Sequence, residues 1–153
     1  MSQITIRLTD PHDPQATALL KASHALMQEL FEPEDSHYLE ISDLCADHIR
    51  FFAAWRDDVA LGCIALANMG DYGEIKSLFV SPDARGTGTG ALLLDHLEAE
   101  ARSQNISHLR LETGDTLHAA HRLYGRAGYT VCGPFGNYVE SPASVFMEKH
   151  LAP

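Results

Sequence analysis

The stretch that decides the fold covers residues 80–90 and reads V80-S-P-D-A-R85-G-T-G-T-G90. It follows the strand-like run I75-K-S-L-F-V80 and precedes the helix-like run A91-L-L-L-D-H-L-E-A-E-A101. One glycine is enough for a turn, and each further glycine increases the entropy lost on folding. Alternate glycines, however, let a backbone approach an anion closely, and the N–H groups at the start of the next helix favour negative charge. The stretch therefore predicts a loop that binds a pyrophosphate, with Arg85 adding a positive charge.

Two other glycine-rich loops can be compared with this stretch. An ATP-binding P-loop requires Lys and Ser or Thr directly after its last glycine, but Ala91 and Leu92 stand there, which excludes it. Gly86, Gly88 and Ala91 fit the GxGxxA pattern of a dinucleotide-binding turn, and Glu112 follows about 20 residues later. That turn comes directly off the first strand of a βαβ unit, whereas four expected strands precede this one. A nicotinamide-dependent reductase is therefore the less favoured alternative.

Composition limits the other classes of function. A chain of 153 residues with 45% hydrophobic residues is expected to form one domain, residues 1–153. The net charge of -10, without clustered Lys or Arg, argues against nucleic-acid binding. The longest apolar run, residues 59–67, is too short to cross a membrane. The polar N-terminus and three cysteines without a CxxC spacing predict a cytoplasmic protein without a structural zinc site.

Hydrophobic periodicity predicts an α/β fold with the order β-α-α-β-β-β-α-β-α-β-β. Alternating Ile4, Ile6 and Leu8 indicate the first strand, and helical spacing indicates a helix over residues 15–31. A polar loop over residues 31–40 leads to a short second helix, residues 42–48. The remaining expected elements are strands at 50–55, 59–67 and 74–80, a helix at 90–103, a strand at 108–113, a helix at 118–126, and strands at 129–132 and 144–150.

Two motifs resemble those of the GNAT superfamily of N-acetyltransferases. Arg85, Gly88 and Gly90 fit its Q/R-x-x-G-x-G/A pyrophosphate loop, and A120-H-R-L-Y124-G-R-A-G128-Y129 is similar to its A-x-x-L-Y segment. L111-E-T-G114 and the tail G133-P-F-G-N-Y138-V-E-S-P142-A-S144-V-F-M-E-K149 resemble small bacterial members. The likeness covers essentially the whole chain. Many relatives have an Asn that helps to hold the cofactor arm, and this chain has Leu117 at that position.

The resemblance implies a GNAT fold, with a single mixed and mostly antiparallel central sheet, and an acetyl transfer from acetyl-CoA to a primary amine. The cofactor arm would pair with the strand at 74–80, and the N–H of Leu78 would face the thioester oxygen. The implied cofactor-binding residues are Leu78, Phe79, Val80, Arg85, Gly86, Thr87, Gly88, Thr89 and Gly90. A binding module that holds CoA without turnover is the alternative function.

Two residues are candidates for proton transfer. Glu74 is the leading general base by its place in the resemblance, although a solvated carboxylate at a strand start is the alternative interpretation. Tyr124 is the candidate acid for the departing thiolate, with plain core packing as the alternative. Both groups would be superfluous in a protein that only binds CoA.

The acceptor amine is expected to meet the irregular segments, because loops on a rigid scaffold commonly carry specificity. The candidate substrate-binding residues are His37, Tyr38, Glu112, Phe135 and Tyr138. Two roles are equally open for Glu112: it is either a second candidate general base or a cap of the following turn. His118 and His121 have helical i, i+3 spacing without a convincing third ligand, so no metal is expected. A small-molecule amine is the expected partner, and the oligomeric state is monomer or homodimer.

Overall fold

A seven-stranded sheet in the order β1-β2-β3-β4-β5-β7-β6 forms the centre of the computed structural model, which describes residues 3–152. All neighbouring strands are antiparallel except β4 and β5, which are parallel. The predicted mixed, mostly antiparallel sheet is therefore confirmed. The strands are β1 (Ile4–Leu8), β2 (Ile49–Arg56), β3 (Val59–Asn68), β4 (Gly73–Val80), β5 (His108–Gly114), β6 (Thr130–Cys132) and β7 (Ser144–His150).

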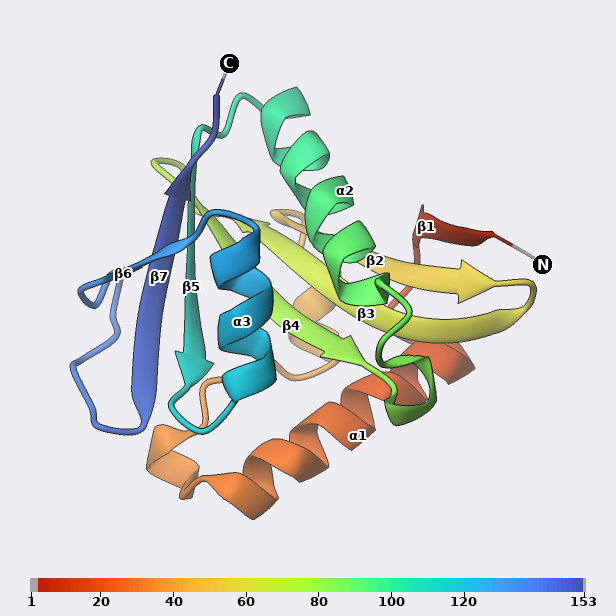
Figure 1. The fold of residues 1–153 in the computed structure, drawn as a ribbon, viewed down its shortest axis with the longest axis horizontal. Coiled ribbons are helices and arrows are strands. Elements are labelled where there is room, and N and C mark those ends of the chain that lie inside the picture. The colour runs from red at the N-terminus through yellow and green to blue at the C-terminus, as the bar shows by residue number, and fades with distance from the viewer. Residues whose placement is uncertain (1–2, 153) are drawn as a thin grey trace.

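Three α-helices cover the two faces of the sheet (Figure 1). Helices α2 (Thr89–Ser103) and α3 (His118–Arg126) lie on one face, and α1 (Pro14–Leu30) lies on the other. Helix α1 begins where the Asp13 carboxylate accepts hydrogen bonds from the N–H groups of Gln15, at 2.9 Å, and Ala16, at 3.2 Å. This side chain satisfies two amides that have no partner within the helix.

The period-2 alternation of the strands divides the core into two layers. Ile64 and Leu66 of β3 face α2 and pack with Leu93 and Leu97, all of them fully buried. Their neighbours on β3, among them Cys63 and Ala65, face α1 instead. Because successive strand residues point to opposite faces, β3 is hydrophobic on both sides and lies in the interior of the sheet.

One expected element is wrong. The second α-helix expected over residues 42–48 is a single 3-10 turn, η2 (Ser42–Cys45), after which Ala46 is extended. A run this short cannot repay the cost of nucleating an α-helix, and Leu44 instead anchors the turn by packing fully buried against the α1 face.

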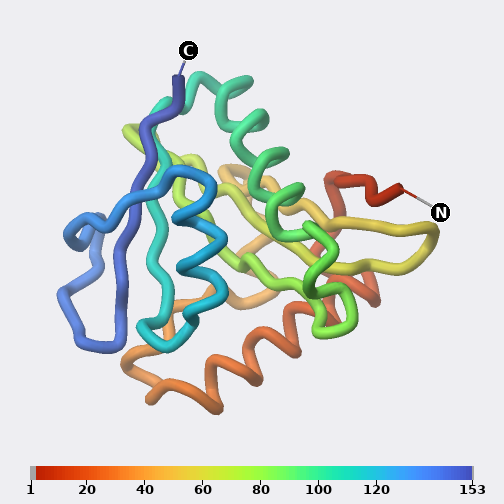
Figure 2. The backbone as a smooth tube through the Cα atoms, in the orientation of Figure 1, coloured from red at the N-terminus to blue at the C-terminus, as the bar shows by residue number. Residues whose placement is uncertain are grey.

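The segment between α1 and β2 runs from the end of α1 past the carboxyl end of β5 (Figure 2). It contains a second 3-10 turn, η1 (Pro33–Asp35), in the region expected to be a loop. The ring of Phe31 packs directly over Gly114 at the end of β5, where a side chain on residue 114 would collide with it. This contact brings the segment to the edge of the site described below. None of the helices between residues 3 and 152 has the length and apolar character needed to cross a membrane.

Candidate active site

Strands β4 and β5 separate along their length, and the separation creates the site. They pair from Gly73 to Ile75 on β4 and from Leu109 to Leu111 on β5, and no further. In Figure 1 they diverge toward their carboxyl ends. The second half of β4 keeps only β3 as a partner, so its backbone on the β5 side is open to an extended ligand.

A backbone irregularity lies where the separation begins. The register between β3 and β4 shifts between Cys63 and Ala65, and Ser77 opposite the shift has a φ of 59°. A non-glycine residue rarely adopts this left-handed conformation. Such bulges bend a strand and increase its twist, which turns β4 away from β5. The Cys63 thiol donates to the Ser77 carbonyl at 3.3 Å and so helps to hold the irregularity in place.

The space between the diverging strands is a cleft that is partly open to solvent. Its walls come from α1, the segment after α1, β4, β5 and the start of α3. Chemically useful groups in the lining are Asp35, His37, Tyr38, Lys76, Glu112 and Tyr124, and Leu117 lines it as well. The cleft therefore brings together five of the sequence-based candidates: His37, Tyr38, Leu78, Glu112 and Tyr124.

Tyr124 presents an unpaired hydroxyl group to this cleft. The residue is 5% exposed, and its hydroxyl makes no hydrogen bond with any residue between 3 and 152. Burial raises the pKa of the phenol well above its usual value, and the nearby Glu112 adds to this effect. The group is therefore a protonated donor at neutral pH, with its hydrogen bond unused.

Glu112 is a carboxylate at the edge of the same cleft, near the end of β5. Its Oε2 accepts a hydrogen bond of 2.8 Å from the Ser144 hydroxyl of β7. Burial raises the pKa of Glu112, and the hydrogen bond from Ser144 partly opposes that change. A carboxylate with a raised pKa is a better proton acceptor than an exposed one.

Glu74 has a different environment, although it lies only one strand away. It is 7% exposed, lies outside the cleft lining, and accepts a 2.6 Å hydrogen bond from the Tyr138 hydroxyl. Lys76 Nζ lies 3.4 Å from the same carboxylate oxygen and donates to Tyr138 Oη at 2.8 Å and to the His37 carbonyl at 2.9 Å. Burial raises the pKa of the Tyr138 phenol, and the negative charge of Glu74 raises it further. These four residues form a closed network that holds the segment after α1 against β4.

The glycine-rich loop opens its backbone outward at the start of α2. Gly86 and Gly88 have φ values of 80° and 83°, with no atom near the position a side chain would occupy. Gly88 caps α2, and no side chain bonds to the first helical amides. The Thr87 hydroxyl donates to the Ala84 carbonyl and lies 2.7 Å from the hydroxyl of buried Thr89. The hydroxyls thus shape the loop, while its free donors are backbone N–H groups.

The other sequence-based candidates are distributed around these groups. Arg85 is exposed at the loop, and Leu78, Phe79 and Val80 form the open half of β4. Phe135 lies behind the cleft, 4% exposed, with its ring 5.8 Å from that of Phe146. His121 Nε2 lies 2.8 Å from the Gly114 carbonyl. His121 is not a member of either group of three possible metal ligands found among residues 3–152.

Two residues were missed by sequence reasoning. Lys76 and Ser144 were not singled out, although Lys76 donates to Tyr138 and Ser144 donates to Glu112. Lys76 carried a weak signal, because it is a charge within the apolar strand run I75-K-S-L-F-V80. Ser144 carried none, since its contact with Glu112 arises from the pairing of β5 with β7.

A sheet that opens between two parallel strands, followed by a glycine loop at a helix start, defines a transferase that takes its acyl group from acyl-CoA. Residues 16–129 match the Acetyltransferase (GNAT) family, so the chain belongs to this family and is a GNAT-type N-acetyltransferase. Members of the family use acetyl-CoA as the acetyl donor. The predicted family is confirmed, and the dinucleotide-binding interpretation of the glycine loop is wrong.

Individual relatives support the same conclusion. The chain is 38% identical to the IAA acetyltransferase of Azospirillum brasilense over 153 residues, which cover 99% of this chain and 100% of that protein. It is 34% identical to the N-acetyltransferase YsnE of Bacillus subtilis over 149 residues, 95% of this chain and 99% of that one. A crystal structure from Klebsiella pneumoniae, described as an acyl-CoA N-acyltransferase, superimposes with a TM-score of 0.85 at 36% identity, covering 98% of this chain and 99% of that chain.

Proposed function

We propose that the protein transfers the acetyl group of acetyl-CoA to a primary amine of a small molecule by direct attack, with Glu112 as the general base and Tyr124 as the general acid. The observation that carries this proposal is the position of both groups in one cleft beside the open half of β4. A silent CoA-binding module would not need a base and an acid facing the same space.

The base has to remove a proton from the acceptor. For an amine with a pKa near 10.4, deprotonation at pH 7 costs roughly 4 to 5 kcal/mol. Glu112 is preferred over Glu74 because it lines the cleft and holds one internal hydrogen bond, to Ser144. Glu74 is instead occupied by Tyr138 and Lys76. The sequence favoured Glu74 as the general base, and this proposal assigns that role to Glu112 instead.

The acyl donor supplies a thioester, and the chain supplies the polar groups around it. The N–H groups of the glycine loop would hold the pyrophosphate, as helix starts with open glycine turns do in general. A backbone N–H on the open half of β4, that of Leu78, would stabilise the negative charge that develops on the thioester oxygen. As the C–N bond forms and the C–S bond breaks, Glu112 takes the amine proton and Tyr124 protonates the leaving thiolate.

The lining favours a cationic or aromatic amine as the acceptor. Asp35 and Glu112 contribute two carboxylates, and His37 and Tyr38 contribute aromatic rings. Lys76 is the basic side chain in the lining, and its ammonium group already donates to Tyr138 and His37. The name of the Azospirillum relative makes IAA a compound to assay separately, beside the panel of amines.

The test combines calorimetric titration with acetyl-CoA and an assay of CoA thiol release against a panel of amines. Glu112→Gln and Tyr124→Phe are each expected to lower kcat by about 10² or more while leaving the Kd for acetyl-CoA unchanged. Tyr124→Phe removes no internal hydrogen bond, so the fold is expected to survive it. Binding of acetyl-CoA without turnover on any amine would favour the silent module. Turnover that survives Glu112→Gln and is lost in Glu74→Gln would return the role of base to Glu74.

A further inference from the structure

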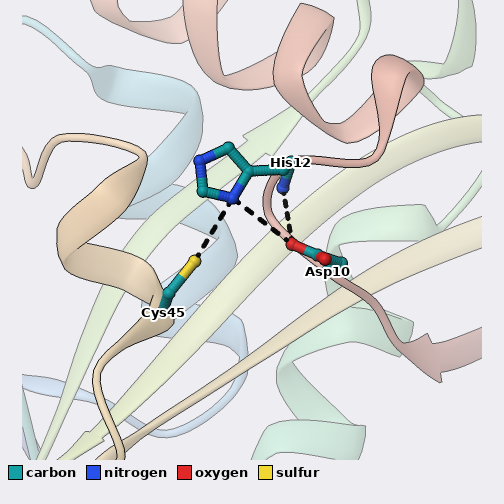
Figure 3. Close-up of side chains that lie close together, drawn as sticks. All are labelled: Asp10, His12 and Cys45. Carbon is teal, nitrogen blue, oxygen red and sulfur yellow. Dashed lines mark hydrogen bonds and ion pairs between the residues drawn. The ribbon is translucent and has the colours of Figure 1, made fainter.

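A second cluster of reactive side chains lies away from the cleft. Asp10 and His12 stand in the turn between β1 and α1, and Cys45 ends η2, 33 residues beyond His12. His12 Nδ1 lies 3.5 Å from Cys45 Sγ and 3.5 Å from Asp10 Oδ1 (Figure 3). All three residues are exposed, and the three ligand atoms lie within 4.8 Å of one another. The acetyl transfer proposed above uses none of them.

The arrangement differs from that of a nucleophilic triad. In such a triad one imidazole nitrogen faces the nucleophile and the other faces the carboxylate. Here the thiol and the carboxylate both approach Nδ1, as the two dashed lines that meet at this atom show (Figure 3). One ring nitrogen carries either a proton or a lone pair, so it forms at most one strong hydrogen bond with these two neighbours. The Cys45 thiol has a second possible acceptor, the Ile41 carbonyl at 3.8 Å. The three ligand atoms lie within 4.8 Å of one another, which is close enough for them to share one ion.

Two of the three distances between the ligand atoms agree with those in a tetrahedral zinc site. With zinc bonds of about 2.3 Å to sulfur and about 2.0–2.2 Å to nitrogen and oxygen, tetrahedral geometry separates sulfur from nitrogen by about 3.6 Å and nitrogen from oxygen by about 3.4 Å. The corresponding separations here are both 3.5 Å. Asp10 Oδ1 is held in place by a 2.9 Å hydrogen bond from the backbone N–H of His12. Little rearrangement is therefore needed to bring three ligands onto one ion.

We propose that Asp10, His12 and Cys45 form a binding site for a thiophilic divalent cation such as Zn²⁺, with water completing the coordination. Binding would release the thiol proton, leaving a thiolate, a neutral imidazole and a carboxylate around the ion. The two negative charges then match the charge of the cation. A thiolate and an imidazole together select zinc and similar metals over Mg²⁺ or Ca²⁺, which prefer oxygen ligands.

Such an ion would connect two segments that are distant in the sequence. It would tie the turn before α1 to the end of η2, and the chain between them carries His37 and Tyr38 at the cleft. Because the ion binds the folded arrangement, it should stabilise the protein. At about a hundredfold excess of Zn²⁺ over the Kd, we expect the melting temperature to rise by roughly 5 to 10 °C.

A second group of ligand atoms provides an internal control. His108, Glu148 and His150 also lie close together, with His108 Nε2 2.7 Å from Glu148 Oε1. Arg110 Nε donates to the same His108 nitrogen at 3.3 Å, and its Nη2 lies 4.0 Å from Glu148 Oε1. This guanidinium group competes with a cation for the same atoms. We therefore propose no metal site there.

The experiment uses the full chain, freed of metal with a chelator and kept reduced with a phosphine rather than a thiol. Titration with Co²⁺ is expected to saturate at one ion per chain, to give a thiolate-to-cobalt charge-transfer absorption, and to lose that absorption when Zn²⁺ is added. Cys45→Ser should abolish the band, and His12→Gln should weaken Co²⁺ binding at least tenfold, a loss on the order of that caused by removing a supporting group in metal sites. All three ligands are exposed, so these variants are expected to fold.

Matched variants at the other cysteine and the other histidine cluster complete the design. Cys132→Ser and His108→Gln should keep the band, its intensity and the stoichiometry of wild type. The absence of a thiolate band in wild type would overturn the proposal. So would a band that persists in Cys45→Ser or disappears in Cys132→Ser.

Discussion

The donor side and the acceptor side of the cleft are built in opposite ways. The donor side consists of residues 78–90, a single stretch that contains the open half of β4, the glycine loop and the start of α2. The acceptor side gathers Asp35, His37 and Tyr38, then Lys76, then Glu112, from three separate parts of the chain. The donor side is thus a local structure, and the acceptor side is a product of tertiary packing.

Because of this difference, the two sides are expected to respond differently to substitution. A loop whose free donors are backbone amides binds a pyrophosphate through groups that every residue possesses, so its chemistry depends on backbone conformation. The acceptor side depends on side chains held by one another, such as the contacts among Glu74, Tyr138 and Lys76. Changes in the glycine loop should therefore act mainly on acetyl-CoA binding, whereas changes on the acceptor side should act on stability and proton transfer.

The largest effect is expected from Gly88→Val. At a φ of 83° a β-branched residue is strained by at least about 1–2 kcal/mol, and its side chain would cover the amides of the loop. The strain favours a rearranged loop whose amides no longer face the ligand, so we expect the Kd for acetyl-CoA, measured by calorimetry, to rise roughly 10- to 100-fold, which corresponds to about 1.4 to 2.8 kcal/mol. Unchanged affinity would break the comparison, because the donor side would then not depend on this backbone conformation.

Gly133→Val is the matched control for this variant. Gly133 is an exposed glycine outside the donor side, without a left-handed φ and with open space around it. Its replacement is expected to leave the Kd for acetyl-CoA as in wild type. An equal loss of affinity in both variants would indicate a general effect of valine on folding.

The same difference decides what could be predicted from the sequence. The glycine loop could be located from the sequence because turn chemistry is local: alternate glycines between a strand and a helix indicate a special backbone conformation, and Gly86 and Gly88 both have positive φ values. On the acceptor side His37 and Tyr38 could be proposed as residues of an irregular segment. The network around Lys76 could not, since it depends on how residues 37, 74, 76 and 138 meet in three dimensions.

The fold shows the same limit. The order in which the strands follow one another along the chain was predicted from period-2 patterns and turns, and it is confirmed. The expected helix at 42–48 was wrong because the local sequence does not tell a 3-10 turn with one buried side chain, Leu44, from the first turn of a helix. The bond between Ser144 and Glu112 requires β7 to pair with β5 so that Phe146 lies opposite Glu112, with Ser144 on the same face two residues earlier.

A smaller effect, on stability, is expected from Glu74→Gln. The change removes the charge that balances Lys76 and weakens an acceptor of the Tyr138 hydroxyl, both largely buried. Leaving buried polar groups without full partners costs about 1–3 kcal/mol, and we expect thermal unfolding to begin roughly 2 to 10 °C lower. Glu140 is an exposed carboxylate in the loop that carries Tyr138. Glu140→Gln is therefore the control and should unfold like wild type. Equal melting temperatures for all three proteins would show that the network does not stabilise the acceptor side.

The smallest expected effect is a shift of the pH–rate profile, which tests whether Glu112 is the group that titrates in it. A general base works only when deprotonated, so the rate should fall on the acid side as pH drops through the pKa of Glu112, which burial places above its ordinary value. The hydrogen bond from Ser144 lowers that pKa. Ser144→Ala should therefore move the acid limb of the kcat profile to higher pH and leave the plateau at high pH nearly unchanged. Ser141→Ala, which removes a hydroxyl bonded to Asp35, should leave the limb in place. A limb that moves equally in both variants, or in neither, would mean that the group titrating in this profile is not Glu112.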